Sequence, residues 1–141
     1  MSRIAIVIAS LLLAANAWAA DLGVSAAWVR LLPAGAPAGA YFTLANQGAK
    51  AVALVGASSP DYGAVMIHKT VEQGGMASMV MVDKVEVPAG GKLEFRPGGY
   101  HLMLMHAKHE IKLGTKIPLT LEFADGRKLT VQFDVRAPGA Q

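Results

Sequence analysis

The chain has 141 residues, of which 53% are hydrophobic and 16% are charged, and its formal net charge at pH 7 is +3. This length predicts one domain of ordinary size. The basic residues are dispersed without a run or a helical stripe, which argues against nucleic acid as a partner. The chain contains no cysteine, so disulfides and thiolate metal ligands are excluded.

Residues 1–19 have the pattern of a secretory signal peptide. Arg3 supplies a positive start, residues 4–15 form an apolar run, and Ala17-Trp18-Ala19 fits a cleavage motif. We expect cleavage there, which leaves residues 20–141 as one exported domain without stable membrane insertion. A retained N-terminal anchor helix is the alternative, but the apolar run is too short to span a bilayer.

Short strands are predicted along the rest of the chain, because runs rich in β-branched and aromatic residues alternate with Gly- and Pro-rich turns. In chain order the candidate strands are residues 24–30, 40–46, 51–57, 64–70, 76–82, 92–95, 100–106, 117–123 and 129–135. No segment has a convincing helical apolar period. This pattern predicts an all-β domain, either an antiparallel sandwich or a small barrel.

The clearest strands lie near the C-terminus. Apolar and polar residues alternate over residues 117–123 and 129–135, and the turn between them contains Asp125-Gly126. Such alternation predicts strands with one buried face, and an Asp-Gly turn joins them into a hairpin. The residues expected on the buried faces are Ile117, Leu119, Leu121, Phe123, Leu129, Val131, Phe133 and Val135.

Methionine and histidine gather in one stretch of the chain. Apart from the initiator, every methionine lies between residues 66 and 105. Within this stretch, ten residues separate His68 from Met79, and twenty-one separate Met79 from His101. One residue then separates His101 from Met103. We call these four residues the predicted ligands.

The donor types in this set predict the metal. Thioether sulfur is a soft, neutral donor that suits Cu(I), and two imidazoles with two thioethers hold a monovalent cation without charge repulsion. Zinc prefers Cys, His and carboxylate ligands, whereas calcium and magnesium need oxygen donors, and the chain has no acidic cluster. The predicted ligands are therefore expected to bind Cu(I), with an affinity that weakens as the pH falls through about 6.

Strand geometry predicts that part of this set shares a face. His101 and Met103 lie two residues apart and therefore on the same side of a strand, and Met105 continues that side. Leu102 and Leu104 lie on the opposite side and are expected in the core.

A hairpin across Gly74-Gly75 would bring the remaining residues together. If His68 lies opposite Met79, antiparallel pairing also places Met66 opposite Met81, and both pairs share one face. We take this register as a hypothesis, because it gives a methionine-lined surface around one imidazole.

Other candidate donors lie close to this set in the sequence. Met66, Met81 and Met105 are possible auxiliary residues, either an outer shell around the metal or a hydrophobic docking rim. His106 and His109 are expected in a solvated segment, with a weak second copper site as the alternative.

The spacing and its surroundings resemble those of the periplasmic copper chaperones of the PCu(A)C family. The pattern of that family is His or Met, ten residues, Met, twenty-one residues, His, one residue and Met, and the predicted ligands fill it. The resemblance runs from about residue 22 to residue 136. The flanking segments that carry it are residues 27–30 (AWVR), 58–60 (SSP), 67–70 (IHKT), 87–91 (VPAGG) and 97–105 (PGGYHLMLM).

The resemblance implies a cupredoxin-like Greek-key β-barrel that holds one Cu(I) near its surface in the periplasm. It implies delivery of copper to respiratory cytochrome oxidase assembly, with an apo copper-site domain of an oxidase subunit as acceptor and a Sco-type thiol protein as a further partner. We expect a carrier and not an enzyme, because the sequence offers no Ser/His/Asp or Cys/His set. We also expect a monomer.

Three other functions are alternatives. A periplasmic storage or resistance protein would bind copper without donating it, and the sequence separates it poorly from a carrier. A blue-copper electron carrier needs a cysteine thiolate ligand, which the chain lacks. A plain interaction module would use its methionines as a hydrophobic patch and would not bind Cu(I).

Overall fold

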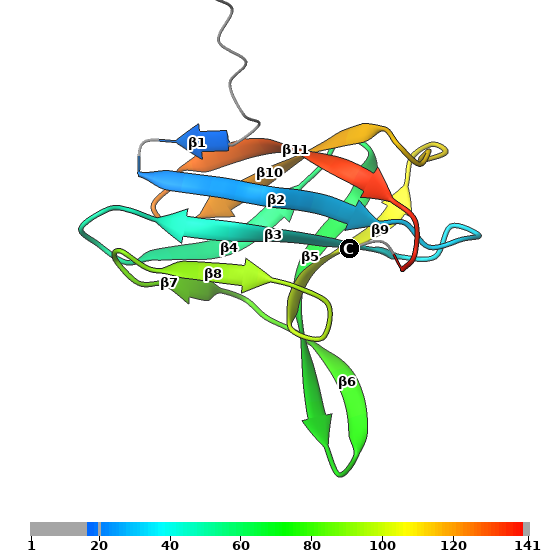
Figure 1. Cartoon of the computed structure of the whole chain (residues 1–141), viewed down its shortest axis with the longest axis horizontal. Coiled ribbons are helices and arrows are strands. Elements are labelled where there is room, and N and C mark those ends of the chain that lie inside the picture. Colours follow the sequence, from blue (N-terminus) through cyan, green and yellow to red (C-terminus); the bar gives the residue numbers. More distant parts are fainter. Residues whose placement is uncertain (1–16, 20, 140–141) are drawn as a thin grey trace, which may run out of the picture.

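The computed structural model describes residues 17–19 and 21–139, and its regular elements over that part of the chain are all strands (Figure 1). The strands are β1 (Ala17–Ala19), β2 (Leu22–Arg30), β3 (Ala38–Asn46), β4 (Val52–Ser58), β5 (Tyr62–Gln73), β6 (Met76–Met81), β7 (Val85–Val87), β8 (Lys92–Phe95), β9 (Tyr100–Ala107), β10 (Lys116–Phe123) and β11 (Lys128–Arg136). The all-β prediction is confirmed. Over the same residues no helix is long and apolar enough to cross a membrane.

Two short strands lie outside the predicted set. β7 is three residues long, which is too short for its apolar and polar alternation to predict a strand. β1 falls in the predicted cleavage motif and pairs with β2, with Ala17 opposite Val24. The preceding part of the predicted signal peptide, residues 1–16, lies outside the described residues, as does residue 20.

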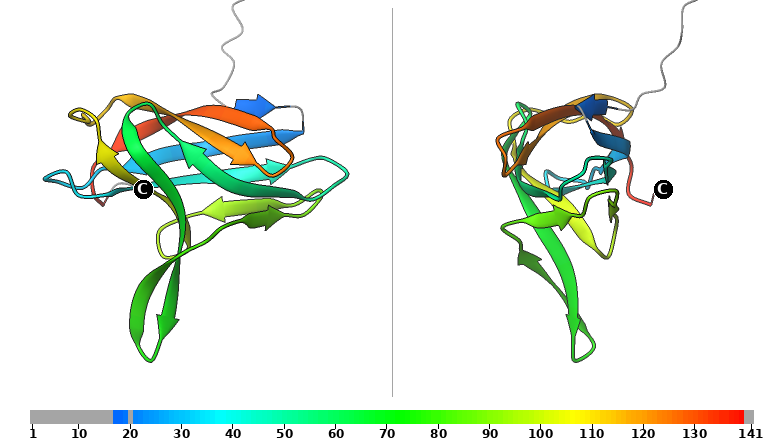
Figure 2. Two further views of the ribbon diagram at one scale, coloured as in Figure 1. Left: turned by 180° about the vertical axis from the view of Figure 1, so that it is seen from behind. Right: turned by 90° about the vertical axis from the view of Figure 1, so that its left-hand side faces the viewer.

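One sheet holds the eleven strands of the described residues. Its order is β6-β5-β9-β3-β2-β11-β10-β4-β7, and β1 and β8 join it at β2 and β3. Paired strands are antiparallel apart from β11 and β2, which run parallel. Because β4 also packs against β5, the sheet curls around the core, as the end-on view in Figure 2 shows.

The core lies inside this curl and consists of alternate residues from the strands. All eight apolar residues predicted for the C-terminal hairpin are buried, and Leu121 lies opposite Leu129 within it. Phe42 on β3 stacks on Phe95 with 4.4 Å between ring centroids, and it meets Phe133 edge-on at 5.8 Å. This packing holds β3 and its neighbour β9 in fixed positions, and the candidate site lies on their outer face.

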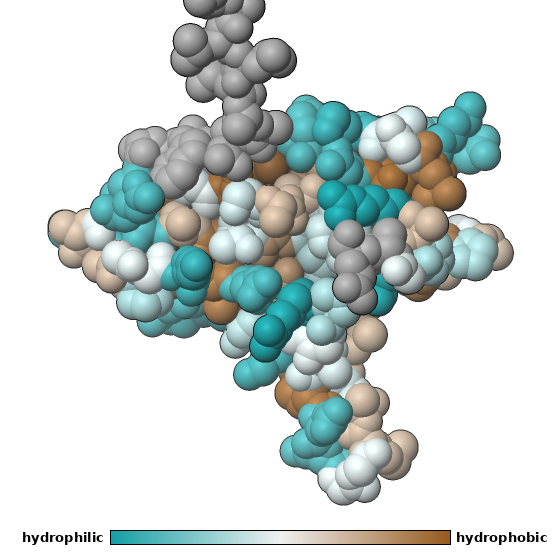
Figure 3. Space-filling model, viewed as in Figure 1, coloured by the Kyte–Doolittle hydropathy of each residue, from teal (hydrophilic) through white to brown (hydrophobic). Residues whose placement is uncertain are grey.

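The hairpin of β5 and β6 projects from the body (Figures 1 and 2). The pairing of β9 with β5 ends at Lys69, which lies opposite Tyr100, and from Thr70 onward the strand partner of β5 among the described residues is β6. Every residue of β6 is exposed, and Met76, next to the turn, is 75% exposed. The space-filling view shows hydrophobic and hydrophilic residues side by side on this hairpin (Figure 3).

The register hypothesis for this hairpin is wrong by two residues. His68 lies opposite Met81 and not Met79, whereas Met79 lies opposite Thr70. Met66 consequently does not face Met81. A shift of two residues leaves every side chain on its original face, so the expected grouping of methionines around His68 survives the correction.

The turn of the hairpin explains the register. Gly74 and Gly75 form its centre, with positive φ angles of 58° and 79°, and Gln73 lies opposite Met76. A two-residue turn of type I′ needs positive φ at both central positions, which glycine adopts without steric cost. The expected register would place Gln73 at one of these positions, where its Cβ atom would be strained.

Cysteine crosslinking tests this register, because the chain has no cysteine of its own. Glu72 and Ala77 lie opposite each other and are exposed. We expect Glu72→Cys with Ala77→Cys to form a disulfide under mild oxidation, since opposite residues of a strand pair have suitable Cα spacing. Thr70→Cys with Ala77→Cys, which pair in the expected register, should stay reduced. Mass spectrometry separates the two results, and crosslinking of the second pair alone would restore the expected register.

Candidate metal site

The predicted ligands come from three neighbouring strands, β6, β5 and β9. His68 lies opposite His101, and Met103 follows two residues further along β9. On β6, Met79 lies opposite Thr70. Residues that face each other across strands, or lie two apart on one strand, project from the same face. All four predicted ligands therefore project from one face of the sheet.

The two imidazoles lie against each other on this face. Their ring centroids are 5.6 Å apart, with an interplanar angle of 70°. His101 is only 5% exposed. Among the described residues, neither its Nε2 atom nor the buried Nδ1 atom of His68 has a hydrogen-bond partner. Buried polar atoms in native proteins are almost always paired. Two unpaired imidazole nitrogens on adjacent side chains thus fit a metal ion as their missing partner.

Burial lowers the pKa of His101. A backbone hydrogen bond at Gly99 opposes this effect, whereas the nearby charges of His68 and Arg30 add to it. A lowered pKa keeps the imidazole neutral near pH 7, and the neutral form has the lone pair that a metal requires.

A hollow of about 100 Å³ opens beside His101. Met79 and Met103 line it, together with Arg30 and Tyr41. Met79 is 57% exposed, whereas Met103 is half-buried. The site therefore has a buried side at His101 and an open side at Met79.

Arg30 and Tyr41 were not predicted as site residues. The ring of Tyr41 on β3 lies 6.4 Å from that of His101 between centroids, and the guanidinium of Arg30 lies 5.4 Å over the Tyr41 ring. Burial raises the pKa of Tyr41, while the charge of Arg30 opposes the shift. Only the strand order β9-β3-β2 brings these residues to the site. The one sequence signal for Arg30 is its place in a segment that resembles the family.

The three auxiliary methionines share the face of the predicted ligands. Met66 lies opposite Met103, and Met105 continues the row along β9. Met81 lies opposite His68 and is 66% exposed. Among the residues that line the hollow beside His101 there is none of these three methionines, and the predicted ligand His68 does not line it either.

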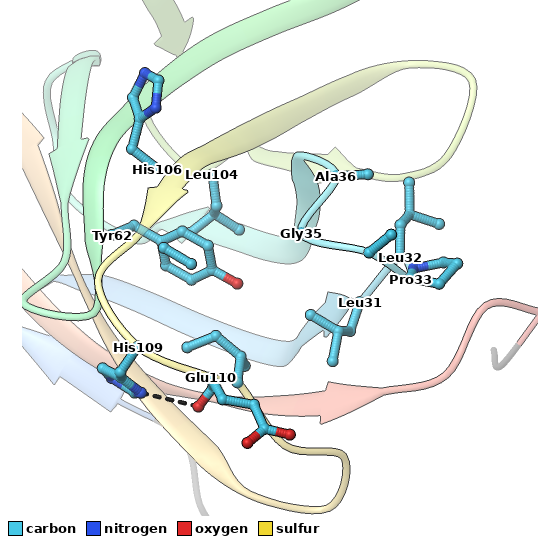
Figure 4. A pocket seen from close by; sticks show the side chains of 13 residues that line it. Leu31, Leu32, Pro33, Gly35, Ala36, Tyr62, Leu104, His106, His109 and Glu110 are labelled. Carbon is cyan, nitrogen blue, oxygen red and sulfur yellow. Dashed lines mark hydrogen bonds between the residues drawn. The ribbon is translucent and has the colours of Figure 1, made fainter.

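His106 and His109 lie elsewhere. Both line a cavity of about 300 Å³ next to Tyr62, and their rings point in different directions (Figure 4). Nε2 of His109 hydrogen-bonds to Oδ1 of Asp61 at 2.6 Å, which raises the pKa of His109, and its Nδ1 meets the Glu110 carbonyl oxygen at 2.9 Å. Among the described residues, no group of three or more His, Cys, Asp or Glu is arranged to hold a metal. This geometry favours the prediction that His106 and His109 belong to a solvated segment over the alternative of a second copper site.

Comparison with known proteins identifies a family by sequence. The family described as "Putative lipoprotein LpqE-like" matches residues 22–135. "Putative lipoprotein Lxx21020" of Leifsonia xyli subsp. xyli (strain CTCB07) is 36% identical over 114 residues, which cover 80% of this chain and 68% of that protein.

Solved structures share the fold. The copper-bound PCuAC domain from PmoF2 matches with a TM-score of 0.74 at 22% identity, over 87% of this chain and 98% of that one. The solution structure of CuI-DR1885 from Deinococcus radiodurans matches with a TM-score of 0.64 at 38% identity, over 78% of this chain and 74% of that one. The fold is the expected cupredoxin-like β fold. The chain belongs to the LpqE-like family, which is the family of the PCuAC domains.

Proposed function

We propose that this protein binds one Cu(I) ion through the predicted ligands and carries it to an acceptor protein in the periplasm. The main support is the pair of buried, unpartnered imidazole nitrogens on the face that also carries the two thioethers. The copper-bound PmoF2 domain and CuI-DR1885 are relatives that hold copper.

The donor chemistry favours Cu(I) over other ions. The predicted ligands are two imidazoles and two thioethers, and burial lowers the pKa of His101, which favours its neutral form. A soft, monovalent ion is stabilised by such donors, whereas zinc, calcium and magnesium prefer thiolate or oxygen ligands. Thioethers also take no part in the thiol–disulfide exchange of an oxidising compartment.

The position of the site suits transfer. Met79 lies on the projecting hairpin and is largely exposed, whereas His101 is buried in the body of the sheet. A donor group of an acceptor can therefore displace Met79 first, while His101 and Met103 still hold the metal. Stepwise exchange of this kind avoids release of free copper.

We further propose that the acceptor is the apo copper-site domain of a respiratory cytochrome oxidase subunit, with a Sco-type thiol protein as a further partner. In this proposal the protein is a monomeric carrier and not an enzyme, exported with removal of residues 1–19. The family resemblance supports the partners, and the signal-peptide pattern of residues 1–19 supports export.

A transfer experiment tests the proposal against its alternative, storage without donation. Cu(I)-loaded protein is mixed without oxygen with an equimolar apo copper-site domain, the two are separated by ion exchange, and copper is measured in each. A carrier is expected to lose most of its copper to the acceptor. Retention by this protein would support storage, and failure to bind Cu(I) at all would contradict both functions.

Cu(I) binding is expected to weaken in acid, because protons compete with the metal for imidazole nitrogen. The pKa of His101 lies below its usual value of 6.5. Protons therefore compete with the metal at this imidazole only below that pH. We expect a constant Kd from about pH 7 to 8 and a rising Kd below about pH 6. A chromophoric Cu(I) chelator, corrected for its own protonation, measures the change. A Kd that is constant from pH 5 to 8 would show that histidine does not bind the metal.

A further inference from the structure

Arg30 lies beside the candidate metal site on a neighbouring strand. In the sheet it faces Gly39 on β3, and Gly39 in turn faces Met103 on β9. The guanidinium lies over the Tyr41 ring and lines the hollow that His101 and Met103 also line. A fixed positive charge therefore borders a site whose proposed occupant is itself a cation.

This charge has no protein counterion among the described residues. Arg30 forms no salt bridge in that part of the chain, and its buried Nε atom has no hydrogen-bond acceptor. The residue opposite it on β11 is Arg136, which lies over the Trp28 ring at 5.5 Å. Asp134, two residues before Arg136 on β11, is already engaged by Lys116 and Arg136. Among the described residues the charge of Arg30 therefore has no ion-pair partner.

We infer that Arg30 binds a carboxylate, and that this carboxylate belongs to an Asp or Glu side chain of the protein that receives the copper. A planar guanidinium with free N–H groups is suited to a carboxylate, with which it forms charge-assisted hydrogen bonds. The apolar residues Leu32, Pro37 and Ala38 also line the hollow, so it fits an acidic side chain with apolar neighbours better than it fits a free anion.

The inference rests on the proposed function, because bound Cu(I) supplies the second positive charge. Cu(I) is monovalent, so loading adds one positive charge next to Arg30 and strengthens the attraction for a carboxylate. A loaded carrier would thus attract the acceptor more strongly than an empty one, and the attraction would fall after transfer. We expect the carboxylate to bind the loaded form about tenfold more tightly than the empty form.

Nitrogen-15 NMR of the Arg30 Nε–H group tests this inference on the mature protein. The empty and Cu(I)-loaded forms are titrated with the peptide Ac-Leu-Glu-Leu-NH2, its Gln analogue and acetate at constant ionic strength. We expect the Glu peptide to shift the Arg30 signal in a saturable way, about tenfold more tightly in the loaded form, and the Gln peptide to have no effect. If the carboxylate belongs to a protein, the Glu peptide should bind more tightly than acetate.

Two variants complete the test. Arg30→Gln should abolish the difference between the Glu and Gln peptides, measured on backbone amides near the hollow of the empty protein. Arg136→Gln, which removes the other guanidinium of this face, should preserve the difference. Equal responses to the two peptides, equal affinity in the loaded and empty forms, or acetate binding as tightly as the Glu peptide would each overturn the inference. Loss of Cu(I) binding in the unmodified protein would instead refute the proposed function.

Discussion

Replacing Met79 and Met103 together by leucine is expected to weaken Cu(I) binding by more than about 100-fold, beyond the typical effect of changing an outer-shell partner. Leucine has nearly the volume of methionine but no sulfur donor, so the change removes coordination and largely preserves packing. Met79 is exposed and Met103 is half-buried. We therefore expect the melting temperature of the copper-free protein to stay close to that of the unmodified chain.

Met76→Leu is the matched control for this variant. Met76 belongs to the same strand as Met79, but the two residues lie three positions apart and project from opposite faces of the hairpin. Its replacement should leave the Kd for Cu(I) unchanged in a chelator competition. If Met76→Leu weakened binding as much as the double variant, the assignment of the site to one face of the hairpin would be wrong.

Phe42→Ala is expected to lower the free energy of unfolding by about 3–5 kcal/mol. Phe42 is 1% exposed and packs its ring against both Phe95 and Phe133. Truncation removes these contacts and leaves a cavity between β3, β8 and β11 that the rigid sheet cannot fill. Urea unfolding followed by tryptophan fluorescence measures the change.

Gln132→Ala is the control for the core variant. Gln132 is exposed on β11 between the buried residues Val131 and Phe133, so its replacement should change the free energy of unfolding by less than about 0.5 kcal/mol. A cost below about 1 kcal/mol for Phe42→Ala would show that this aromatic cluster is not the centre of the core.

The buried faces of β9, β10 and β11 could be predicted because burial on one side of a strand imposes a period of two on the sequence. Leu102 and Leu104 are fully buried, as expected from their alternation with His101 and Met103. The same period cannot detect a register shift of two residues, since both registers give the same faces. In the β5–β6 hairpin, the requirement for positive φ at Gly74-Gly75 decides between them.

The surroundings of the site could not be predicted in the same way. Arg30 and Tyr41 reach His101 through the pairing of β2 with β3 and of β3 with β9. These pairings depend on the order of strands in the sheet, and no local pattern encodes that order. The burial of His101 also depends on neighbours that are distant in the sequence. Alternation therefore predicts the strand face on which His101 lies but not how deeply it is buried.

X-ray absorption spectroscopy at the copper edge tests the central claim most directly. The protein is loaded with one equivalent of Cu(I) without oxygen, and the scatterers around the metal are counted. Coordination by the predicted ligands requires two nitrogen and two sulfur scatterers, and replacing Met79 and Met103 by leucine should remove both sulfurs. A first shell without sulfur in the unmodified protein, or one that keeps both sulfurs in the variant, would contradict the proposed site.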